Sequence, residues 1–347
     1  MDYHTSTSKT SVGMRTTALL AILVAVMVGI VSSDVAGATH VPPTLVGSHP
    51  HARQQPTAAG RRIEVVSGFA GRVYFGYGDT VGNTGPIVIS SYEPNRRAWT
   101  DHLTFRTEKV GRFRTIGRAL WAPAWDATGR EDVAYAATNS RHAWGAAGVG
   151  LRPVHVYDAS ARVPAERYIS GAFEGIGGAV AAWTGKGWGI SLSVPGQYSR
   201  FYHLGALHEK LYTVLGNVSG TAPDHDVGQA SYVFDGTTWS RGPRLDGFIK
   251  PMLFAGTLVY RSEDGRLLSF DGTTIRTLSA PGAVDHDVAG GKLVVFFGVS
   301  RKLYSTSDMV SWTTVGTVPS SATAVGLLDG FAYLGTADAE VYKMPLH

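Results

Sequence analysis

Phe234-Asp235-Gly236-Thr237-Thr238-Trp239 is repeated 36 residues later as Phe270-Asp271-Gly272-Thr273-Thr274-Ile275. An Asp-Gly pair at this position is typical of a tight turn between two antiparallel strands. The bulky residue after the turn, Trp239 or Ile275, is suited to pack between neighbouring sheets. The repeated hairpin therefore indicates an architecture built from recurring β-strand units.

A second marker extends the repeat over most of the chain. It is a small turn, often containing Gly, followed by a strand rich in β-branched and aromatic residues. The marker recurs at Val73, Leu120, Tyr168, Leu211, Leu258, Leu293 and Ala332, with gaps of 47, 48, 43, 47, 35 and 39 residues. Gaps of this size are typical of four-stranded propeller blades. The sequence predicts an all-β fold, a β-propeller with seven blades over residues 61–347, with six or eight blades as the alternatives. We expect the marked strands to be the innermost strands of their blades.

Two further turns carry a family resemblance. Ser91 to Trp99 resembles the Tyr-Asp-Pro…Trp hairpin of kelch-type propellers, and Ser307 to Trp312 resembles a degenerate Asp-box of sialidase-like propellers. The resemblance covers residues 61–347 and implies a propeller architecture, and it assigns no catalytic residues. A sialidase would gather three arginines, for which Arg112 and Arg114 are candidates, but the Arg-Ile-Pro motif of that family is absent.

The last unit ends after two strands, near Glu340 to Lys343. A propeller closes its ring when a distant segment completes such a blade, and closure leaves few exposed sheet edges. We expect Arg62 to Val66 to supply the missing strand.

Composition narrows the class of protein. The chain of 347 residues is 44% hydrophobic and 17% charged, with a net charge of +4 and no Cys. These values exclude full disorder, coiled coils, disulfide frameworks and thiolate metal sites. Basic residues are scattered and form no stripe, so no nucleic-acid partner is expected.

The N-terminus is typical of an export signal. Lys9 and Arg15 precede an apolar run from Thr17 to Val31, and Ala36-Gly37-Ala38 offers small residues at a cleavage position. Residues 1–38 are predicted to be a signal peptide, or an N-terminal membrane anchor whose helix uses residues 14–31. A flexible linker is expected over residues 39–60. In both cases the propeller is secreted or extracytoplasmic, and its only membrane contact is through an uncleaved N-terminal segment.

The repeat also predicts a binding site. A polar residue stands shortly before each marked strand, and equivalent positions of a propeller converge on its axis. The predicted funnel residues are Arg114, His155, His203, Lys250, Asp285, His286 and Asp287, with Glu64 in the first unit. Their mainly cationic side chains favour an acidic ligand.

Two classes of function follow from this funnel. The first is a non-catalytic module that binds an extracellular glycan or protein, and the alternative is a carbohydrate-active enzyme, a glycoside hydrolase or polysaccharide lyase. No catalytic residue can be named, and no cofactor is expected. Ca²⁺ in the Gly-rich loop from Tyr77 to Pro86 and a His-only metal site are the weaker alternatives.

Overall fold

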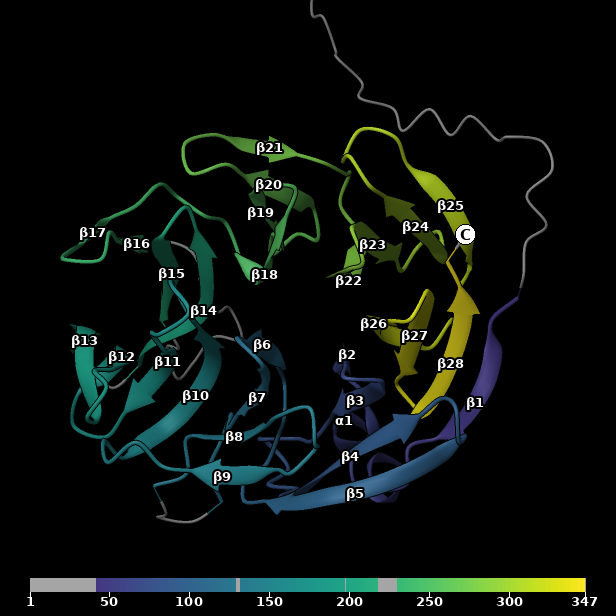
Figure 1. The fold of residues 1–347 in the computed structure, drawn as a ribbon, viewed down its shortest axis with the longest axis horizontal. Helices are drawn as coiled ribbons and strands as arrows, with labels where there is room; N and C mark the ends of the chain where they lie inside the picture. The colour runs from purple at the N-terminus through teal and green to yellow at the C-terminus, as the bar shows by residue number, and fades with distance from the viewer. Residues whose placement is uncertain (1–41, 129–131, 197, 218–229, 347) are drawn as a thin grey trace, which may run out of the picture. The chain divides into compact units, whose positions relative to one another are not determined.

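The computed structural model describes residues 42–128, 132–196, 198–217 and 230–346 and confirms the seven-bladed β-propeller. Each blade is a sheet of four antiparallel strands, and the blades surround a central channel (Figure 1). The predicted export segment, residues 1–38, lies outside the described residues.

Innermost strands from successive blades contact one another around the channel. They are β2 (Val65–Phe69), β6 (Arg114–Ile116), β10 (Pro153–Ser160), β14 (Ser199–Leu207), β18 (Ile249–Phe254), β22 (Ala283–Ala289) and β26 (Ala322–Leu328). The second strands are β3 (Arg72–Gly76), β7 (Ala119–Pro123), β11 (Tyr168–Phe173), β15 (Lys210–Asn217), β19 (Thr257–Arg261), β23 (Lys292–Phe297) and β27 (Phe331–Thr336).

The outer half of each blade is a hairpin or, in the last blade, a pair of chain ends. The third strands are β4 (Ile87–Glu93), β8 (Tyr135–Thr138), β12 (Gly177–Trp183), β16 (Ala230–Phe234), β20 (Leu267–Phe270), β24 (Lys302–Thr306) and β28 (Glu340–Pro345). The outermost strands are β5 (Ala98–Phe105), β9 (Gly145–Ala147), β13 (Trp188–Val194), β17 (Trp239–Arg241), β21 (Ile275–Thr277), β25 (Thr313–Thr317) and β1 (Thr44–Ser48).

The marked apolar strands are the second strands of their blades, so the expectation that they are innermost is wrong. Second strands are covered on both faces by neighbouring blades, and all six residues of β11 are buried. Innermost strands carry polar side chains toward the channel and therefore have a weaker apolar pattern. The predicted funnel residues consequently lie on the innermost strands themselves, apart from Glu64, which immediately precedes β2.

The repeated Asp-Gly turns join the third and outermost strands, as expected. Asp235 Oδ1 accepts hydrogen bonds from the backbone N–H groups of Thr237 and Thr238, both at 2.8 Å. Asp271 and Asp308 accept two backbone N–H bonds in the same way in the next two blades. Trp239 stacks on Phe234 and donates its indole N–H to Ser191 of the preceding blade at 2.9 Å.

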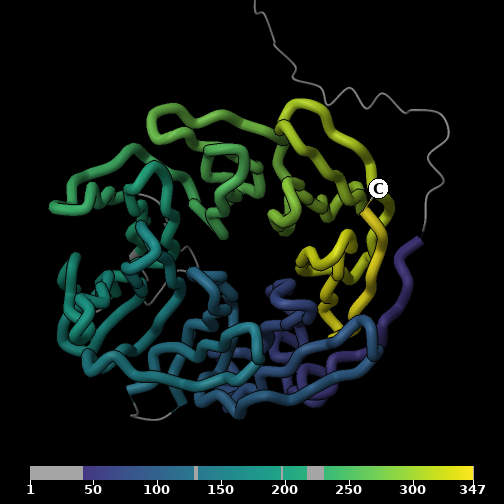
Figure 2. The backbone as a smooth tube through the Cα atoms, viewed as in Figure 1, coloured from purple at the N-terminus to yellow at the C-terminus, as the bar shows by residue number. Residues whose placement is uncertain are grey.

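Ring closure differs from the expectation. β1 pairs with β28, with Thr44 opposite Lys343, and so completes the last blade, whereas Val65 begins the innermost strand of the first blade. Figure 2 shows the N-terminal strand in purple beside the C-terminal strand in yellow. The flexible linker predicted for residues 39–60 is therefore wrong from Thr44 onward. Its polar composition misled the prediction because an edge strand needs only one buried face.

The segment after β1 is fixed by His49, which is fully buried. Its Nδ1 accepts the backbone N–H of Ala52 at 3.0 Å, and Nε2 lies 2.9 Å from the Ser90 hydroxyl. Two short helices follow, η1 (Ala52–Gln54) and α1 (Ala58–Arg61). Among the residues that the structure describes, no helix has the length and apolar character needed to cross a membrane.

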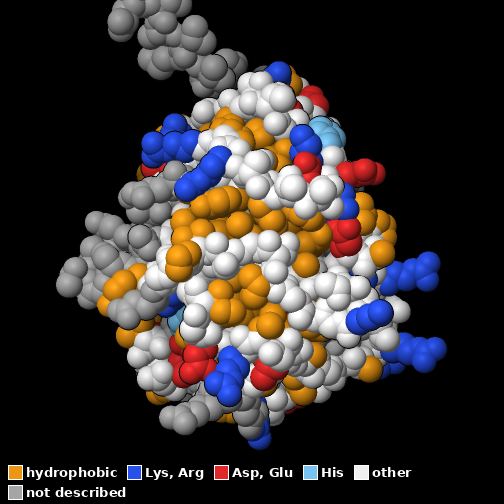
Figure 3. Space-filling view, turned by 90° about the vertical axis from the view of Figure 1, so that its left-hand side faces the viewer, with side chains coloured by type: hydrophobic (Ala, Val, Ile, Leu, Met, Phe, Trp, Pro, Cys, Tyr) orange, Lys and Arg blue, Asp and Glu red, His pale blue; other side chains and the backbone are white. Residues whose placement is uncertain are grey.

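The hydrophobic core lies between the blades. Each of seven clusters joins two adjacent sheets; Tyr168 and Val180 of one blade, for example, pack with Leu204 and Leu211 of the next. Burying one such side chain contributes roughly 1.5–3 kcal/mol. On the side of the propeller shown in Figure 3, basic side chains are scattered among acidic and apolar ones.

Candidate functional site

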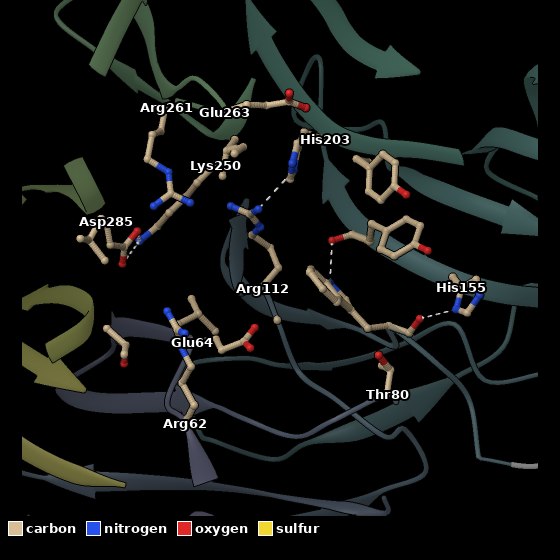
Figure 4. A pocket seen from close by; sticks show the side chains of 18 of the residues that line it. Arg62, Glu64, Thr80, Arg112, His155, His203, Lys250, Arg261, Glu263 and Asp285 are labelled. Atoms are coloured by element: carbon tan, nitrogen blue, oxygen red, sulfur yellow. Dashed lines mark hydrogen bonds and ion pairs between the residues drawn. The ribbon is translucent and has the colours of Figure 1, made fainter. Parts of the chain in front are cut away.

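A cavity of about 1030 Å³ opens at the end of the channel where the innermost strands begin. We call it the first cavity (Figure 4). Its polar lining consists of Arg62, Glu64, Thr80, Arg112, His155, Arg200, His203, Lys250, Arg261, Glu263, Asp285 and Thr323, and its aromatic lining of Trp125, Tyr157 and Tyr202. Such a size is ordinary for a ligand site.

Irregular strand pairing shapes this end of the channel. The pairing register of the innermost with the second strand shifts near the start of five blades, at His155, Phe201–Leu204, Ile249–Met252, Ala283–Asp285 and Ala322–Ala324. A bulge redirects side chains and is common next to functional sites. Lys250 lies in one of these shifts with φ of 53°, in the left-handed region, and its side chain reaches Asp285 of the next blade.

The structure divides the predicted funnel residues between two cavities. His155, His203, Lys250 and Asp285 line the first cavity. Arg114, Lys250 and Asp287 line a second cavity, where the innermost strands end. His286 lines neither. It is 1% exposed, and burial lowers its pKa to about 3. The chain therefore does not form a single funnel that holds all seven predicted residues.

Between the cavities lie two ion pairs, whose four residues we call the septum. Arg114 donates from Nε and Nη2 to the carboxylate of Asp158 at 2.7 and 2.6 Å. Lys250 Nζ donates to both oxygens of Asp285 at 2.9 Å. Lys250 lines both cavities, Asp285 lines the first and Arg114 lines the second, so the septum lies at their boundary.

The septum neutralises two of the predicted cations. Asp158, which is fully buried, was missed by the sequence analysis, although it lies on an innermost strand like the other polar residues. Arg114 holds the pKa of Asp158 below its usual value, against the opposing effect of burial. Lys250 does the same for Asp285. Neither Arg114 nor Lys250 is therefore available as the main anion-binding group of the first cavity.

Arg112 takes that position instead. It is 5% exposed, and its Nη2 donates to His203 Nδ1 at 3.2 Å. Among the described residues no carboxylate lies within 4 Å of it, and its Nε has no hydrogen-bond partner. Burial lowers the pKa of Arg112 to about 10, so the side chain remains a cation at neutral pH.

His203 is held as a neutral ring beside this cation. Burial and the nearby Arg112 lower its pKa well below the ordinary value. Because a guanidinium only donates hydrogen bonds, Nδ1 of His203 accepts and its proton lies on Nε2. The cation–histidine pair is visible at the centre of Figure 4.

The other arginines increase the positive charge of the first cavity. Arg62 and Arg261 have no carboxylate within 4 Å in the described part of the chain. Glu64 is paired with Lys109, at 2.6 Å between Oε2 and Nζ. The cavity therefore presents more cationic than anionic groups to a ligand.

Aromatic rings form the opposite wall. Tyr157 lies between Tyr202 and His155, and its ring centroid is 4.6 Å from that of Tyr202 and 5.6 Å from that of His155. Trp125 packs edge-on against Tyr157, with 5.4 Å between their ring centroids. Flat aromatic faces beside charged groups suit a ligand with an apolar face and a polar edge, such as a sugar ring.

His155 is oriented by two acceptors. Its Nδ1 lies 2.9 Å from the Trp125 carbonyl oxygen and 3.7 Å from Asp126 Oδ2. A carbonyl only accepts, so the proton of the neutral ring lies on Nδ1 and Nε2 keeps a lone pair. Burial lowers the pKa of His155, and Asp126 partly opposes this shift.

The described residues contain no group of three or more His, Asp or Glu side chains arranged to hold a metal ion. In the Gly-rich loop, the Asp79 carboxylate accepts hydrogen bonds from the Thr57 hydroxyl at 2.8 Å and from the Val81 N–H at 3.0 Å.

No protein-family model and no curated protein matches the sequence. Among solved structures, the chain is similar to a catalytically inactive His-to-Ala variant of virginiamycin B lyase from Staphylococcus aureus with quinupristin. The TM-score is 0.59 and the sequence identity is 10%, and the match covers 84% of this chain and 98% of the lyase. The computationally designed Ika8 protein has a TM-score of 0.51 and 12% identity over 88% of this chain and all of the design.

PorZ, an essential surface component of the type IX secretion system of Porphyromonas gingivalis, has a TM-score of 0.54 and 11% identity over 88% of this chain and 38% of PorZ. At these identities the similarity concerns the fold alone. This chain shares the β-propeller fold with a lyase, a designed protein and a secretion-system component.

Proposed function

We propose that the first cavity binds an acidic carbohydrate of the extracellular space. The observation that carries the proposal is Arg112, a buried cation at the cavity wall with no carboxylate within 4 Å in the described residues and one unsatisfied N–H group. A buried charge without a partner costs free energy, and a ligand carboxylate would offset that cost.

The aromatic wall argues for a sugar as the carrier of the carboxylate. Trp125, Tyr157 and Tyr202 line the cavity with apolar ring surface that suits a sugar, and Arg62 and Arg261 in the same lining would pair with further acidic groups of an oligosaccharide. A charge-assisted hydrogen bond contributes about 1.5–3 kcal/mol, which corresponds to about one to two decades in Kd.

Export remains part of this proposal. The apolar run from Thr17 to Val31 and the small residues before Thr39 support it. The similarity of fold to PorZ, a bacterial surface component, is consistent with a propeller that works outside the cytoplasm.

The test is titration calorimetry with tri-galacturonate, and with maltotriose as the neutral counterpart. We expect Arg112→Gln to weaken binding of the acidic sugar by about 10- to 100-fold. Arg152→Gln is the matched control, since Arg152 is exposed and paired with Glu174 outside the cavity. Unchanged binding of tri-galacturonate by Arg112→Gln would place the acidic-sugar site elsewhere.

A second candidate is a polysaccharide lyase acting in the same cavity, and the orientation of His155 favours it. With Nδ1 held by the Trp125 carbonyl, Nε2 is oriented to take the proton from the carbon next to a uronate carboxylate. The electron pair of the broken C–H bond forms the C=C bond while the C–O bond to the leaving sugar breaks, and the leaving oxygen takes a proton from water. The measurement is the growth of ultraviolet absorbance from the unsaturated product when polyuronates are added. We expect His155→Ala to lose this absorbance and the control Arg152→Gln to retain it. If the unmodified protein produces no such absorbance, the lyase proposal is wrong.

A further inference from the structure

The second cavity, of about 510 Å³, differs in character from the first. It lies where the innermost strands end, and the side chains at its walls are largely apolar. Ile116, Met252, Leu253, Val288 and Leu327 contribute to them. Leu253 is 58% exposed, which leaves an apolar surface at the cavity rim.

Most charged groups of this cavity are already paired. Arg114 and Lys250 belong to the septum and are bound to their aspartates. Arg162 forms two hydrogen bonds with the Glu166 carboxylate and a third with the Glu209 carbonyl oxygen. None of these three cations is free to meet a ligand anion.

Asp287, the acidic residue in the lining of this cavity, has no ion-pair partner among the described residues. It is 8% exposed, and no cationic side chain lies within 4 Å of it in the described ranges. Its Oδ2 accepts the backbone N–H of Leu327 at 2.7 Å. The backbone groups of Leu327 and Val288 favour the ionised carboxylate but do not neutralise it, so Asp287 is a buried anion in the lining of a largely apolar cavity.

We propose that the second cavity binds a primary ammonium group carried on a short aliphatic chain, with Asp287 as its counter-ion. The ammonium supplies the charge that the carboxylate lacks, and the aliphatic chain replaces water along the apolar walls. An anionic ligand would be repelled by Asp287, and a neutral alcohol would leave the charge unpaired. A free alkylamine and a lysine side chain of a protein partner carry the same chemistry.

The binding is linked to pH through Asp287. Burial raises its pKa to about 6, while Lys250 on β18 lowers that pKa and Asp285 on β22 raises it. β26 contributes the Leu327 N–H, and Arg114 on β6 is engaged by Asp158. Only the ionised carboxylate attracts an ammonium, so affinity should rise as the pH rises through about 6.

The test is titration of the whole protein with n-hexylamine, with hexanol and hexanoate as neutral and anionic counterparts. We expect hexylamine alone to bind, about 10-fold or more tightly at pH 7.5 than at pH 5. Asp287→Asn should abolish this preference and weaken binding by at least about 10-fold. Asp329→Asn is the matched control, because Asp329 is exposed in the turn that follows β26.

Failure to bind hexylamine at either pH, or equal binding by Asp287→Asn, would overturn the proposal. If Asp287→Asn does not fold, the pH dependence of the unmodified protein decides, since equal affinity at both pH values is incompatible with a carboxylate counter-ion. Nα-acetyl-lysine amide in place of hexylamine distinguishes a lysine-bearing partner from a free amine. Arg112→Gln should leave hexylamine binding unchanged, so this test and the test of the first cavity fail independently.

Discussion

The two cavities are built by the same innermost strands, yet they hold buried charges of opposite sign. The first has Arg112 at its wall, with further arginines and an aromatic face, whereas the second is largely apolar and has Asp287 in its lining. Each of the two charges lacks an ion-pair partner among the residues described. The repeat therefore fixes where side chains converge, while the individual strands fix what those side chains attract.

The septum makes the difference possible. Arg114–Asp158 and Lys250–Asp285 place two cations and two anions between the cavities, and the pairs nearly cancel. Because these four charges are paired, Arg112 and Asp287 keep their separate attraction for ligands of opposite charge.

Loss of one septum partner should have the largest effect. Asp158→Ala leaves Arg114 buried without its counter-ion and removes the acceptor of the Leu204 N–H, at 3.0 Å. We expect a loss of about 3–5 kcal/mol in the free energy of unfolding, measured by urea denaturation. The double variant Arg114→Met/Asp158→Leu should recover much of the lost free energy of unfolding, because it leaves no buried charge unpaired. If the double variant is as unstable as Asp158→Ala, packing and not charge stabilises the septum.

Asp287→Asn should change the free energy of unfolding in the opposite direction and by a smaller amount. The pKa of Asp287 is raised from 3.8 to about 6, so its contribution to stability is fully present below pH 3.8 and lost as the pH rises through 6. The variant carries no charge, and its amide oxygen can still accept the Leu327 N–H. We expect it to be more stable than the parent at pH 7 by on the order of 2 kcal/mol and no more stable near pH 3.5. Thermal unfolding at both pH values measures this, and a variant that is less stable at pH 7 would contradict a buried, unpaired carboxylate.

The smallest effect concerns coupling between the cavities. In a double-mutant cycle with Arg112→Gln and Asp287→Asn, we expect the two changes in unfolding free energy to add within about 0.5 kcal/mol. Arg112 lines only the first cavity and Asp287 lines only the second, so neither should sense the loss of the other. A coupling well above this value would mean that the cavities act as one site.

Local sequence determined the blades. The Asp235 and Asp271 turns could be predicted because their hydrogen bonds reach only two or three residues along the chain. The seven apolar strands could be counted because β-branched and aromatic residues at regular spacing require burial on both faces. Polar residues at equivalent repeat positions also indicated correctly that the channel would be lined by charged groups.

Tertiary structure alone decided what those groups do. Arg114 meets Asp158 from 44 residues away, Lys250 meets Asp285 from 35, and β1 completes a blade begun almost 300 residues later. Each pairing depends on the direction of side chains at bulged strands and on the closure of the ring, and a repeat pattern contains neither. For this reason the sequence predicted one cationic funnel, whereas the folded chain has two cavities of opposite charge with paired ions at their boundary.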